Sequence, residues 1–462
     1  MIAVRGMQRD ARSRPILVAL ALAASFALVP GSTASATTPG TQLWARHDDD
    51  PAGGVDVAYA VAASPDGSKV FVTGDSADDY ATVAYRTSDG ARLWASRYDG
   101  PVNGSDVAND IVVSPDGSSV FVTGSSDARR GTGWATIAYD TSTGSALWTR
   151  RHFGAAQAVA VSPDGSRVFV GGGVPTTIGD TDYATLAYDA RTGATKWARR
   201  YDGPAHLFDA ISGVVATDDR VFVTGTSYVS NIRFDDFTTI AYDASTGAKM
   251  WRRRYDGPAS GYDVASGIAA SADGSTVFVT GSSATGAYPF DLATVAYAGS
   301  SGKRLWARRY DAGDDDEAVA VAATADGSEV FVTGLSYRWP ASGGDFATVA
   351  YRGGSGTREW IARYTSANAN IDTPESIAAS PDGTAAYVTG YSYRGPATGG
   401  DFTTLAYDAA SGAVRWSRSF DGGHGENDVA WSVAADPDGS KVFVCGRIGE
   451  TQPDYGTVAY AA

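Results

Sequence analysis

The sequence contains little cysteine and histidine, and each shortage excludes a class of protein. Among 462 residues there are 1 Cys and 4 His. One cysteine cannot build a disulfide framework, and four scattered histidines do not make a histidine-rich metal site. Basic residues are also outnumbered, with 37 Lys and Arg against 52 Asp and Glu. The resulting net charge of −15 argues against nucleic acid or an anionic membrane as partner.

A helical period is also missing beyond the N-terminal segment. The chain is instead rich in glycine and aromatic residues, with 55 Gly, 24 Tyr and 11 Trp. This composition predicts many short strands joined by tight turns. Length alone would suggest about three domains of roughly 150 residues each. The repeats described next predict a different organisation.

Residues 1–36 are typical of a secretory signal peptide. Four arginines precede the apolar run 16–29, and Ala34-Ser35-Ala36 supplies the small residues of a cleavage site. The run is too short to span a bilayer, and its arginine flank fits a buried core helix poorly. We therefore expect cleavage after Ala36 and a secreted, extracellular product without membrane insertion. Removal of the segment would make the net charge −18.

One unit of about 53 residues recurs eight times. The motif Val70-Phe71-Val72-Thr73-Gly74 returns with its glycine at 124, 172, 225, 281, 334, 390 and 446. A turn such as Ser64-Pro65-Asp66-Gly67 precedes most copies, and a strand ending in Ala-Tyr follows each one. A second glycine turn then leads to a strand with a tryptophan. Each unit is therefore predicted to contain four strands.

The two ends of the chain complete one another. The last unit stops after Ala459-Tyr460 without its fourth strand, whereas Gly40 to Trp44 carries the fourth-strand pattern unattached. We expect residues 41–47 to complete the last unit. The predicted fold is thus all-β: one eight-bladed β-propeller over residues 37–462, with four antiparallel strands per blade. The expected blades are residues 51–98, 101–152, 153–201, 204–255, 258–310, 311–364, 365–420, and 421–462 together with 41–47.

The motif from Ala138 to Trp148 reads A-x-D-x-x-T-G-x-x-x-W and returns at 187–197 and 241–251, and with serine for threonine at 406–416. It resembles the tryptophan-docking repeat of pyrroloquinoline-quinone (PQQ) type propellers. The whole unit is still more similar to the bacterial secreted β-propeller repeats. The resemblance covers residues 41–462 and implies the fold, but it leaves the function open because such repeats occur in dehydrogenases, assembly scaffolds and surface proteins alike.

Residues that recur in every blade are expected to serve packing and turns. The eight docking tryptophans are the largest such set: Trp44, Trp94, Trp148, Trp197, Trp251, Trp306, Trp360 and Trp416. A second set starts the innermost strand: Asp56, Asp106, Asp209, Asp263, Asp316, Asp372 and Asp428, with Gly154 as the exception. These carboxylates could form a cation-binding ring at the channel mouth. The favoured interpretation is that each accepts backbone N–H groups of its own inter-blade loop.

Positions that differ between blades are the candidates for function. Three residues after the repeated aspartate, the innermost strand carries Tyr59, Asn109, Gln157, Ser212, Ser266, Val319, Glu375 and Trp431. Such diversity suits a binding surface, although drift at an exposed position explains it equally well. The variable loops add Trp134, Arg338, Trp339, Arg394 and His424 on the same face. Aromatic residues interleaved with arginine suit a glycan or another protein.

Metal and catalytic signals are weak. Asp314-Asp315-Asp316 is a weak calcium candidate because it lacks the spaced oxygen pattern of a known loop. Cys445 replaces the threonine of the repeat and is expected to be a small packed side chain. His152 replaces a repeated tyrosine. No Ser/His/Asp set can be assembled, so no catalytic residue and no cofactor is predicted.

Three hypotheses follow. The leading one is a monomeric, secreted binding or scaffold propeller that presents its loop face to an extracellular protein or polysaccharide. The second is a quinoprotein-like oxidoreductase with PQQ and calcium, although adjacent cysteines and a recognisable calcium-binding set are missing. The third is a hydrolase or lyase of extracellular polymers, which would require a carboxylate pair such as Glu375 with a ring aspartate.

Overall fold

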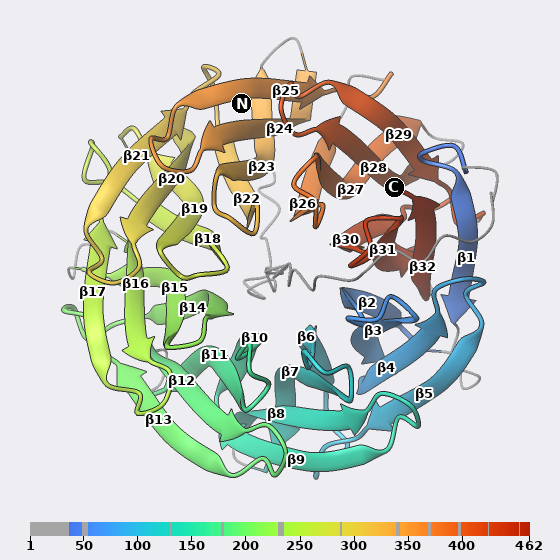
Figure 1. Cartoon of the computed structure of the whole chain (residues 1–462), viewed down its shortest axis with the longest axis horizontal. Helices are drawn as coiled ribbons and strands as arrows, with labels where there is room; N and C mark the ends of the chain where they lie inside the picture. Colours follow the sequence, from blue (N-terminus) through green and yellow to red (C-terminus); the bar gives the residue numbers. More distant parts are fainter. Residues whose placement is uncertain are drawn as a thin grey trace, which may run out of the picture.

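The computed structural model describes residues 37–48, 54–129, 131–176, 180–229, 235–286, 289–338, 342–367, 371–395, 399–423, 425–451 and 453–462. Within these residues the chain forms eight antiparallel sheets of four strands each, arranged in a ring whose innermost strands surround the central axis, called the channel below (Figure 1). The described residues contain no α-helix, and hence none that could cross a membrane. The signal peptide predicted for residues 1–36 lies outside the described residues.

Each sheet runs from the channel to the outer wall. The innermost strands are β2 (Asp56–Ala63), β6 (Asp106–Val113), β10 (Ala155–Val161), β14 (Asp209–Ala216), β18 (Asp263–Ala270), β22 (Asp316–Ala323), β26 (Asp372–Ala379) and β30 (Val429–Ala435). The second strands are β3 (Lys69–Ser76), β7 (Ser119–Ala128), β11 (Arg167–Pro175), β15 (Arg220–Tyr228), β19 (Thr276–Ala284), β23 (Glu329–Arg338), β27 (Ala385–Gly395) and β31 (Lys441–Ile448).

The third strands are β4 (Asp79–Arg86), β8 (Gly131–Asp140), β12 (Thr181–Asp189), β16 (Asp235–Asp243), β20 (Phe290–Ala298), β24 (Ser342–Arg352), β28 (Gly399–Asp408) and β32 (Asp454–Ala461). The outer strands are β5 (Arg92–Tyr98), β9 (Ala146–Phe153), β13 (Thr195–Tyr201), β17 (Lys249–Tyr255), β21 (Arg304–Tyr310), β25 (Arg358–Tyr364), β29 (Val414–Phe420) and β1 (Gln42–Asp48). Blades 1 to 8 are numbered from β2, so that blade 8 consists of β30, β31, β32 and β1.

The predicted ring closure is confirmed. Strand β1 pairs with β32 in antiparallel register, with Trp44 opposite Ala459 and Ala45 opposite Val458. The last sheet therefore has the order β1-β32-β31-β30 and combines both ends of the chain. On its inner side, the Val61 N–H of blade 1 donates to the Ser432 hydroxyl of blade 8 at 3.3 Å.

The core lies between neighbouring blades. One buried cluster, for example, joins Phe71, Tyr80 and Trp94 of blade 1 to Ile111 and Val122 of blade 2. Each sheet thus buries both faces against its neighbours, which explains why strands such as Val-Phe-Val-Thr-Gly read as continuous apolar runs rather than as alternating ones. A single blade removed from the ring would expose two apolar faces.

The docking tryptophans tie each blade to the next. All eight are between 5 and 9% exposed. In seven of them the indole Nε1 donates to a backbone carbonyl in the third-to-fourth-strand turn of the following blade, as Trp94 does to Thr141 O at 2.9 Å. The eighth, Trp416, packs against Tyr387 and Tyr460.

An arginine two residues after the tryptophan reinforces this contact in six blades. Arg199 illustrates it: the guanidinium lies over the Trp197 ring, 5.7 Å from its centroid, and donates to Gly247 O at 2.6 Å. The equivalent residues are Arg46, Arg150, Arg253, Arg308 and Arg418. The repeated Trp-x-Arg pattern is therefore explained by the joints between blades.

Candidate binding face and central channel

Both kinds of variable loop emerge at one end of the ring. In blade 1, Asp56 at the start of β2 lies opposite Ser76 at the end of β3, and Ser76 lies opposite Asp79 at the start of β4. The β3–β4 loop and the loops that enter and leave the blade therefore lie at the same end of the sheet. The tight Ser-Pro-Asp-Gly turns lie at the other end, where Gly67 N–H donates to Ser64 O at 2.9 Å. We call the end with the variable loops the loop face.

The repeated aspartates anchor the inter-blade loops. All seven are 0–2% exposed. In six of them a carboxylate oxygen accepts the N–H of a residue in the preceding loop, as Asp106 Oδ2 does from Gly100 at 2.5 Å. Asp316 also accepts a hydrogen bond from the hydroxyl of Ser336, which lies opposite it in the second strand. These bonds explain why the residue recurs in nearly every blade.

The eight diverse positions of the innermost strand share one structural feature. Each lies where the register between the first and second strands shifts by one residue, so each is the extra residue of a β-bulge. Tyr59, for instance, lies between Ala58, which pairs with Gly74, and Ala60, which pairs with Thr73. Since the innermost strands surround the central axis (Figure 1), the eight bulges occur at equivalent positions around it. We call these positions the bulge ring.

The bulge ring divides into two halves of four consecutive blades. The polar arc, in blades 2 to 5, consists of Asn109, Gln157, Ser212 and Ser266. Three of its side chains reach the next blade: Asn109 Nδ2 donates to Ala156 O at 2.7 Å, Ser212 Oγ to Ala265 O at 2.6 Å and Ser266 Oγ to Ala318 O at 2.7 Å. Each acceptor is the carbonyl immediately before the next bulge. These side chains therefore join neighbouring innermost strands.

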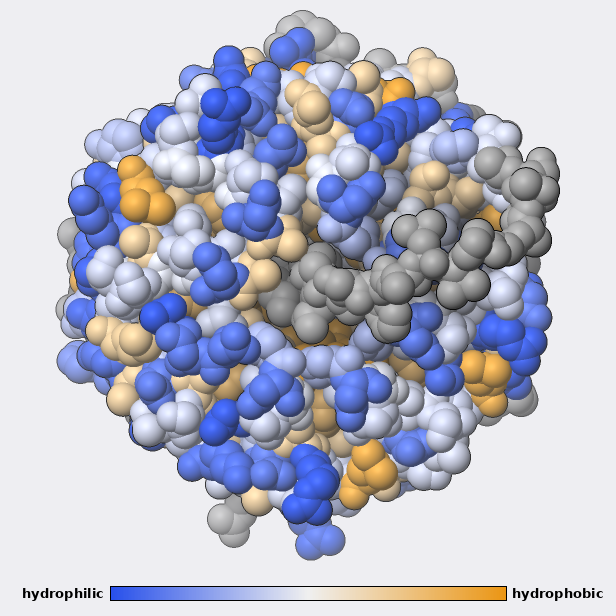
Figure 2. Space-filling view, viewed as in Figure 1, coloured by the Kyte–Doolittle hydropathy of each residue, from blue (hydrophilic) through white to orange (hydrophobic). Residues whose placement is uncertain are grey.

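The aromatic arc, in blades 6 to 8 and blade 1, consists of Val319, Glu375, Trp431 and Tyr59. All four are half-buried. The Trp431 and Tyr59 rings approach each other across the seam between blades 8 and 1, with centroids 6.3 Å apart and an interplanar angle of 46°. Glu375 is the one ionisable side chain in the whole bulge ring apart from the Tyr59 phenol. Figure 2 shows hydrophilic and apolar residues interspersed over one end of the ring, with apolar residues among those near the centre.

A buried carboxylate lies directly behind the polar arc. Asp110 follows the bulge residue Asn109 and is 4% exposed. Its Oδ2 accepts the Val159 N–H of blade 3 at 2.7 Å, and its Oδ1 accepts its neighbour Ile111 N–H at 2.8 Å. Burial raises the pKa of this carboxyl to about 7, although both hydrogen bonds act in the opposite direction. In blades 7 and 8 the same position holds a serine, which also accepts an N–H of the next blade.

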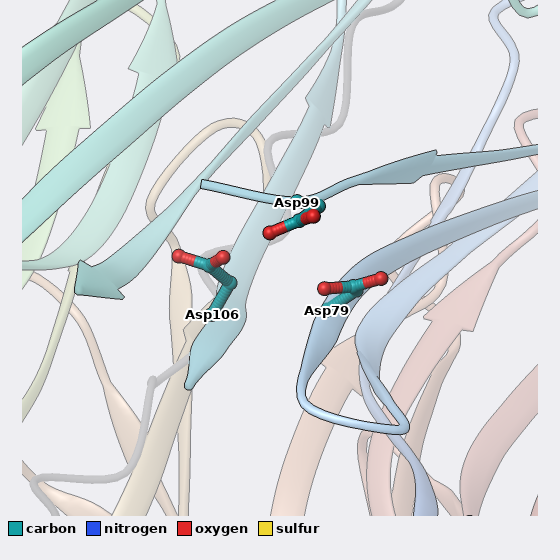
Figure 3. Close-up of side chains that lie close together, drawn as sticks. All are labelled: Asp79, Asp99 and Asp106. Carbon is teal, nitrogen blue, oxygen red and sulfur yellow. The ribbon is translucent and has the colours of Figure 1, made fainter. Parts of the chain in front are cut away.

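Acidic clusters occur where neighbouring blades meet on the loop face. Four junctions have three carboxylates with oxygens within 4.8 Å of one another: Asp79, Asp99 and Asp106; Asp182, Asp202 and Asp209; Asp236, Asp256 and Asp263; Asp401, Asp421 and Asp428. Figure 3 shows the first of these acidic junctions, with the three carboxylates turned toward a common space. In each, the first residue is near the start of a third strand. The second lies in the loop after the outer strand of the same blade, and the third starts or precedes the innermost strand of the next blade.

An arginine pairs with the first carboxylate of each acidic junction. Arg97 pairs with Asp79 at 3.1 Å and Arg394 pairs with Asp401 at 3.3 Å, while Arg200 and Arg254 contact Asp182 and Asp236. Burial, together with neighbouring carboxylates, raises the pKa of Asp236 to about 7 and that of Asp401 to about 6. Carboxylates are suitable ligands for calcium. In these junctions, however, one carboxylate already binds an arginine and another binds loop N–H groups, so their main effect is a negative potential on the loop face.

The acidic run before β22 has a similar local role. Asp316 accepts the Ala312 N–H at 2.6 Å, and Asp315 Oδ1 accepts the Phe290 N–H at 2.9 Å. Two members of Asp314-Asp315-Asp316 are thus bound to backbone donors of their own surroundings.

The rim residues expected from the sequence differ in their placement. Arg338 is exposed at the end of β23, and Arg394, at the end of β27, forms the ion pair with Asp401. Trp134 is not on an exposed rim. It is 0% exposed and stacks on His152 with centroids 4.7 Å apart, because it takes the place of the buried aromatic residues that begin the third strand in other blades, such as Tyr80. Trp339 and His424 lie outside the described residues.

The lone cysteine is a core residue. Cys445 is 0% exposed and packs with Val61 and Phe443 at the seam between blades 8 and 1. Burial raises the pKa of its thiol, which disfavours the nucleophilic thiolate.

The fold is shared with several solved propellers. BamB from Moraxella catarrhalis is 15% identical with a TM-score of 0.52, and the match covers 92% of this chain and 100% of that one. Quinohemoprotein alcohol dehydrogenase from Comamonas testosteroni is 12% identical with a TM-score of 0.54, covering 91% of this chain and 76% of that one. Sqt1 from Chaetomium thermophilum, bound to the N-terminus of the ribosomal protein L10, is 12% identical with a TM-score of 0.59, covering 90% and 98%. At these identities the likeness shows the fold alone.

The search of curated proteins gives no match. The family described as outer membrane protein assembly factor BamB, whose model is built on PQQ-type repeats, matches residues 31–234, 135–362 and 235–452. These overlapping matches extend over most of the chain and agree with the docking repeat in every blade. The chain therefore belongs to the BamB-like family of PQQ-type repeat propellers.

Proposed function

We propose that the protein is a secreted binding propeller that presents its loop face and bulge ring to an extracellular partner, without catalysis. The observation that carries this proposal is the alignment of eight bulges in the channel wall. The bulge positions carry the most diverse side chains of the innermost strands, and four of them form a contiguous half-ring of half-buried aromatic, apolar and acidic side chains. Bulges in this position redirect side chains and are common next to functional sites.

Relatives of the same fold support a binding role. One is an assembly factor by its family description, and another was solved bound to the N-terminus of a ribosomal protein. A protein partner is therefore the first class to test, with polysaccharide as the second. We also propose that the protein acts as a monomer, because the ring closes on itself and needs no second chain to complete a blade.

The bulge ring does not fit PQQ. This cofactor is a planar quinone with three carboxylates, and its binding site has to supply positive charge or hydrogen-bond donors. The eight ring positions contain no Lys, Arg or His, and Glu375 adds a negative charge. Three of the polar ring side chains donate to backbone carbonyls instead. We therefore derive no redox chemistry from this ring.

A polymer-cleaving site has little support either. It would need a carboxylate pair with both members facing the substrate. Asp372 is the repeated aspartate at the start of the strand that carries Glu375. It is 0% exposed and accepts the Ser366 N–H at 2.6 Å. Its carboxylate is therefore committed to the loop before β26.

Binding arrays test the proposal. The protein is applied to arrays of extracellular proteins, peptides and glycans, alongside an aromatic-arc variant with Tyr59→Ala, Glu375→Ala and Trp431→Ala. A matched control, Arg191→Glu, changes an exposed residue in the β12–β13 turn at the opposite end of the ring. We expect at least one class of molecule to bind to the original protein and to the control but not to the aromatic-arc variant. Equal binding by both variants would contradict the proposal, and so would turnover of a bound glycan.

A further inference from the structure

The aromatic arc combines two features that recognise organic cations. Trp431 and Tyr59 present neighbouring aromatic rings, 6.3 Å between centroids, from adjacent blades. Glu375 occupies the equivalent bulge position of β26 in blade 7, and β26 is the innermost strand next to β30, which carries Trp431. Aromatic faces attract ammonium and guanidinium groups, and a carboxylate forms strong charge-assisted hydrogen bonds with them.

The surroundings of the arc are also negative. The acidic junction of Asp401, Asp421 and Asp428 lies between blades 7 and 8, and that of Asp79, Asp99 and Asp106 lies between blades 1 and 2. These two acidic junctions flank the pair of blades that carries Trp431 and Tyr59. The whole chain also has a net charge of −15. Such a field raises the local concentration of cationic ligands.

The polar arc offers no comparable site. The side chains of Asn109, Ser212 and Ser266 donate to the backbone of the next blade. They lack both a charge and an aromatic face. A cationic ligand in the channel is therefore expected to contact one half of the bulge ring only.

We propose that the aromatic arc receives an arginine or lysine side chain from an extended basic segment of a protein partner. The cation would lie against Trp431 and Tyr59 and pair with Glu375, while further basic residues would be attracted by the flanking acidic junctions. This inference rests on the proposed binding function and narrows its partner to a basic peptide. A neutral polysaccharide could also stack on the aromatic rings, but it would gain nothing from Glu375 or from the acidic junctions.

Two synthetic peptides distinguish these partners. The first is a fluorescein-labelled 12-residue peptide of alternating Arg and Gly, and the second has citrulline, a neutral isostere, in place of every Arg. Fluorescence anisotropy with the full chain is expected to show binding of the first peptide, with affinity at least tenfold lower for the second. Affinity for the Arg peptide should also fall as salt is raised.

Three variants locate the site. Glu375→Gln keeps the size of the side chain and should weaken binding of the Arg peptide by about tenfold. Trp431→Leu should weaken it by a similar factor through loss of the cation–π contact. Leu147→Ala, at an exposed position of the outer strand β9, is the control and should change affinity less than twofold. A thermal melt of each variant shows that the fold is retained, and Glu375→Gln alone decides the test if Trp431→Leu does not fold.

Several outcomes would overturn the inference. One is unchanged binding by Glu375→Gln, and another is equal affinity for the citrulline peptide. The exposed residues Asp99 and Asp421 are tested together as Asp99→Asn with Asp421→Asn. If this double variant loses binding and Glu375→Gln does not, the negative charge of the loop face alone recognises the peptide. Binding to glycans without any binding to the Arg peptide would also reject the basic partner, yet it would leave the proposed binding function standing. If no class of molecule in the array binds, both the basic partner and the proposed binding function are rejected.

Discussion

The indole Nε1 of Trp44 donates a hydrogen bond to the carbonyl oxygen of Thr87, at 2.8 Å, across the seam where the two ends of the chain meet. Trp44 belongs to β1, which completes blade 8, and Thr87 lies in the β4–β5 turn of blade 1. The same contact joins blades in the middle of the ring, as from Trp94 to Thr141. The seam is therefore built like the six other joints that contain this hydrogen bond.

Trp44→Ala should destabilise the protein by about 3–5 kcal/mol, because it removes a buried aromatic side chain and opens a cavity at the seam. Trp44→Phe should cost less, since it keeps much of the packing but loses the Nε1 hydrogen bond. The free energy of unfolding in urea measures both. The neighbouring Leu43, 37% exposed, provides the control, and Leu43→Ala should stay within about 0.5 kcal/mol of the original protein. If Leu43→Ala and Trp44→Ala lower the free energy of unfolding by similar amounts, the contact of Trp44 with blade 1 does not stabilise the seam.

Gly90→Ala should be more destabilising than Gly439→Ala. The two glycines have nearly the same backbone conformation, with φ of +68° and +69°. A left-handed conformation costs a non-glycine residue about 1–2 kcal/mol in either place. At Gly90 the added Cβ would also lie 2.6 Å from the Trp44 ring, whereas at Gly439 it meets nothing within 4 Å. Overpacking adds about 1–3 kcal/mol more at Gly90.

Unfolding free energies of the two alanine variants, measured side by side, isolate this crowding. If the two losses agree within error, the indole ring moves aside without cost and the glycine is required only for its conformation.

The fold could be predicted from the sequence because every blade repeats the same local signals. The Gly40 to Trp44 pattern at one end and the missing fourth strand at the other specify the closure, and β1 pairs with β32 as expected. The ring positions such as Tyr59 and Glu375 could also be recognised by their diversity. Their position at bulges could not, because a bulge is a shift in hydrogen-bond register between two strands and leaves no residue signature where any side chain fits.

The division of the bulge ring into two arcs was also beyond the sequence. It depends on which side chains reach the carbonyl before the next bulge, as Ser212 reaches Ala265 O, and that requires distances between blades. The burial of Trp134 had a usable signal, since Tyr80 occupies the same place in blade 1. The acidic junctions unite residues from two blades and a loop, such as Asp79, Asp99 and Asp106, which only the closed ring brings together.

The buried carboxyl of Asp110 should make stability depend on pH. Its pKa is about 7 in the folded protein, against 3.8 for the ordinary side chain, so the folded state keeps a proton that the unfolded chain has lost between these values. The contribution of this group to stability is therefore fully present below about pH 4 and is lost as pH rises through about 7. Asp110→Ser introduces the residue found at this position in blades 7 and 8, where the hydroxyl accepts an N–H of the next blade.

Relative to the original protein, Asp110→Ser should gain stability as pH rises from 4 to 8, by up to about 1.4 kcal/mol per pH unit. Urea unfolding at several pH values measures the difference in unfolding free energy between the two proteins. The contributions of the other titrating aspartates cancel in this difference. Parallel curves would show that Asp110 has an ordinary pKa.

Cys445→Thr should stabilise the protein by about 1 kcal/mol, through a hydrogen bond that the other blades already have. In blade 1 the Thr73 hydroxyl lies 2.9 Å from that of Thr82, its partner in the third strand, and the same threonine pair recurs in blades 2, 4, 5, 6 and 7. In blade 8 the partner of Cys445 is Thr457, so the Thr457 hydroxyl has no hydroxyl opposite it in the second strand. Thr185 in blade 3, opposite Gly171, has the same deficit.

Cys445→Val separates the hydroxyl from the shape of the side chain, because valine has the form of threonine without its oxygen. Unfolding free energies should rank Cys445→Thr above both Cys445→Val and the original protein. Equal stability of the threonine and valine variants would show that the new hydroxyl does not reach Thr457. Since Cys445 packs at the seam between blades 8 and 1, a gain from threonine would also show that this seam is less completely bonded than the joints in which both threonines are present.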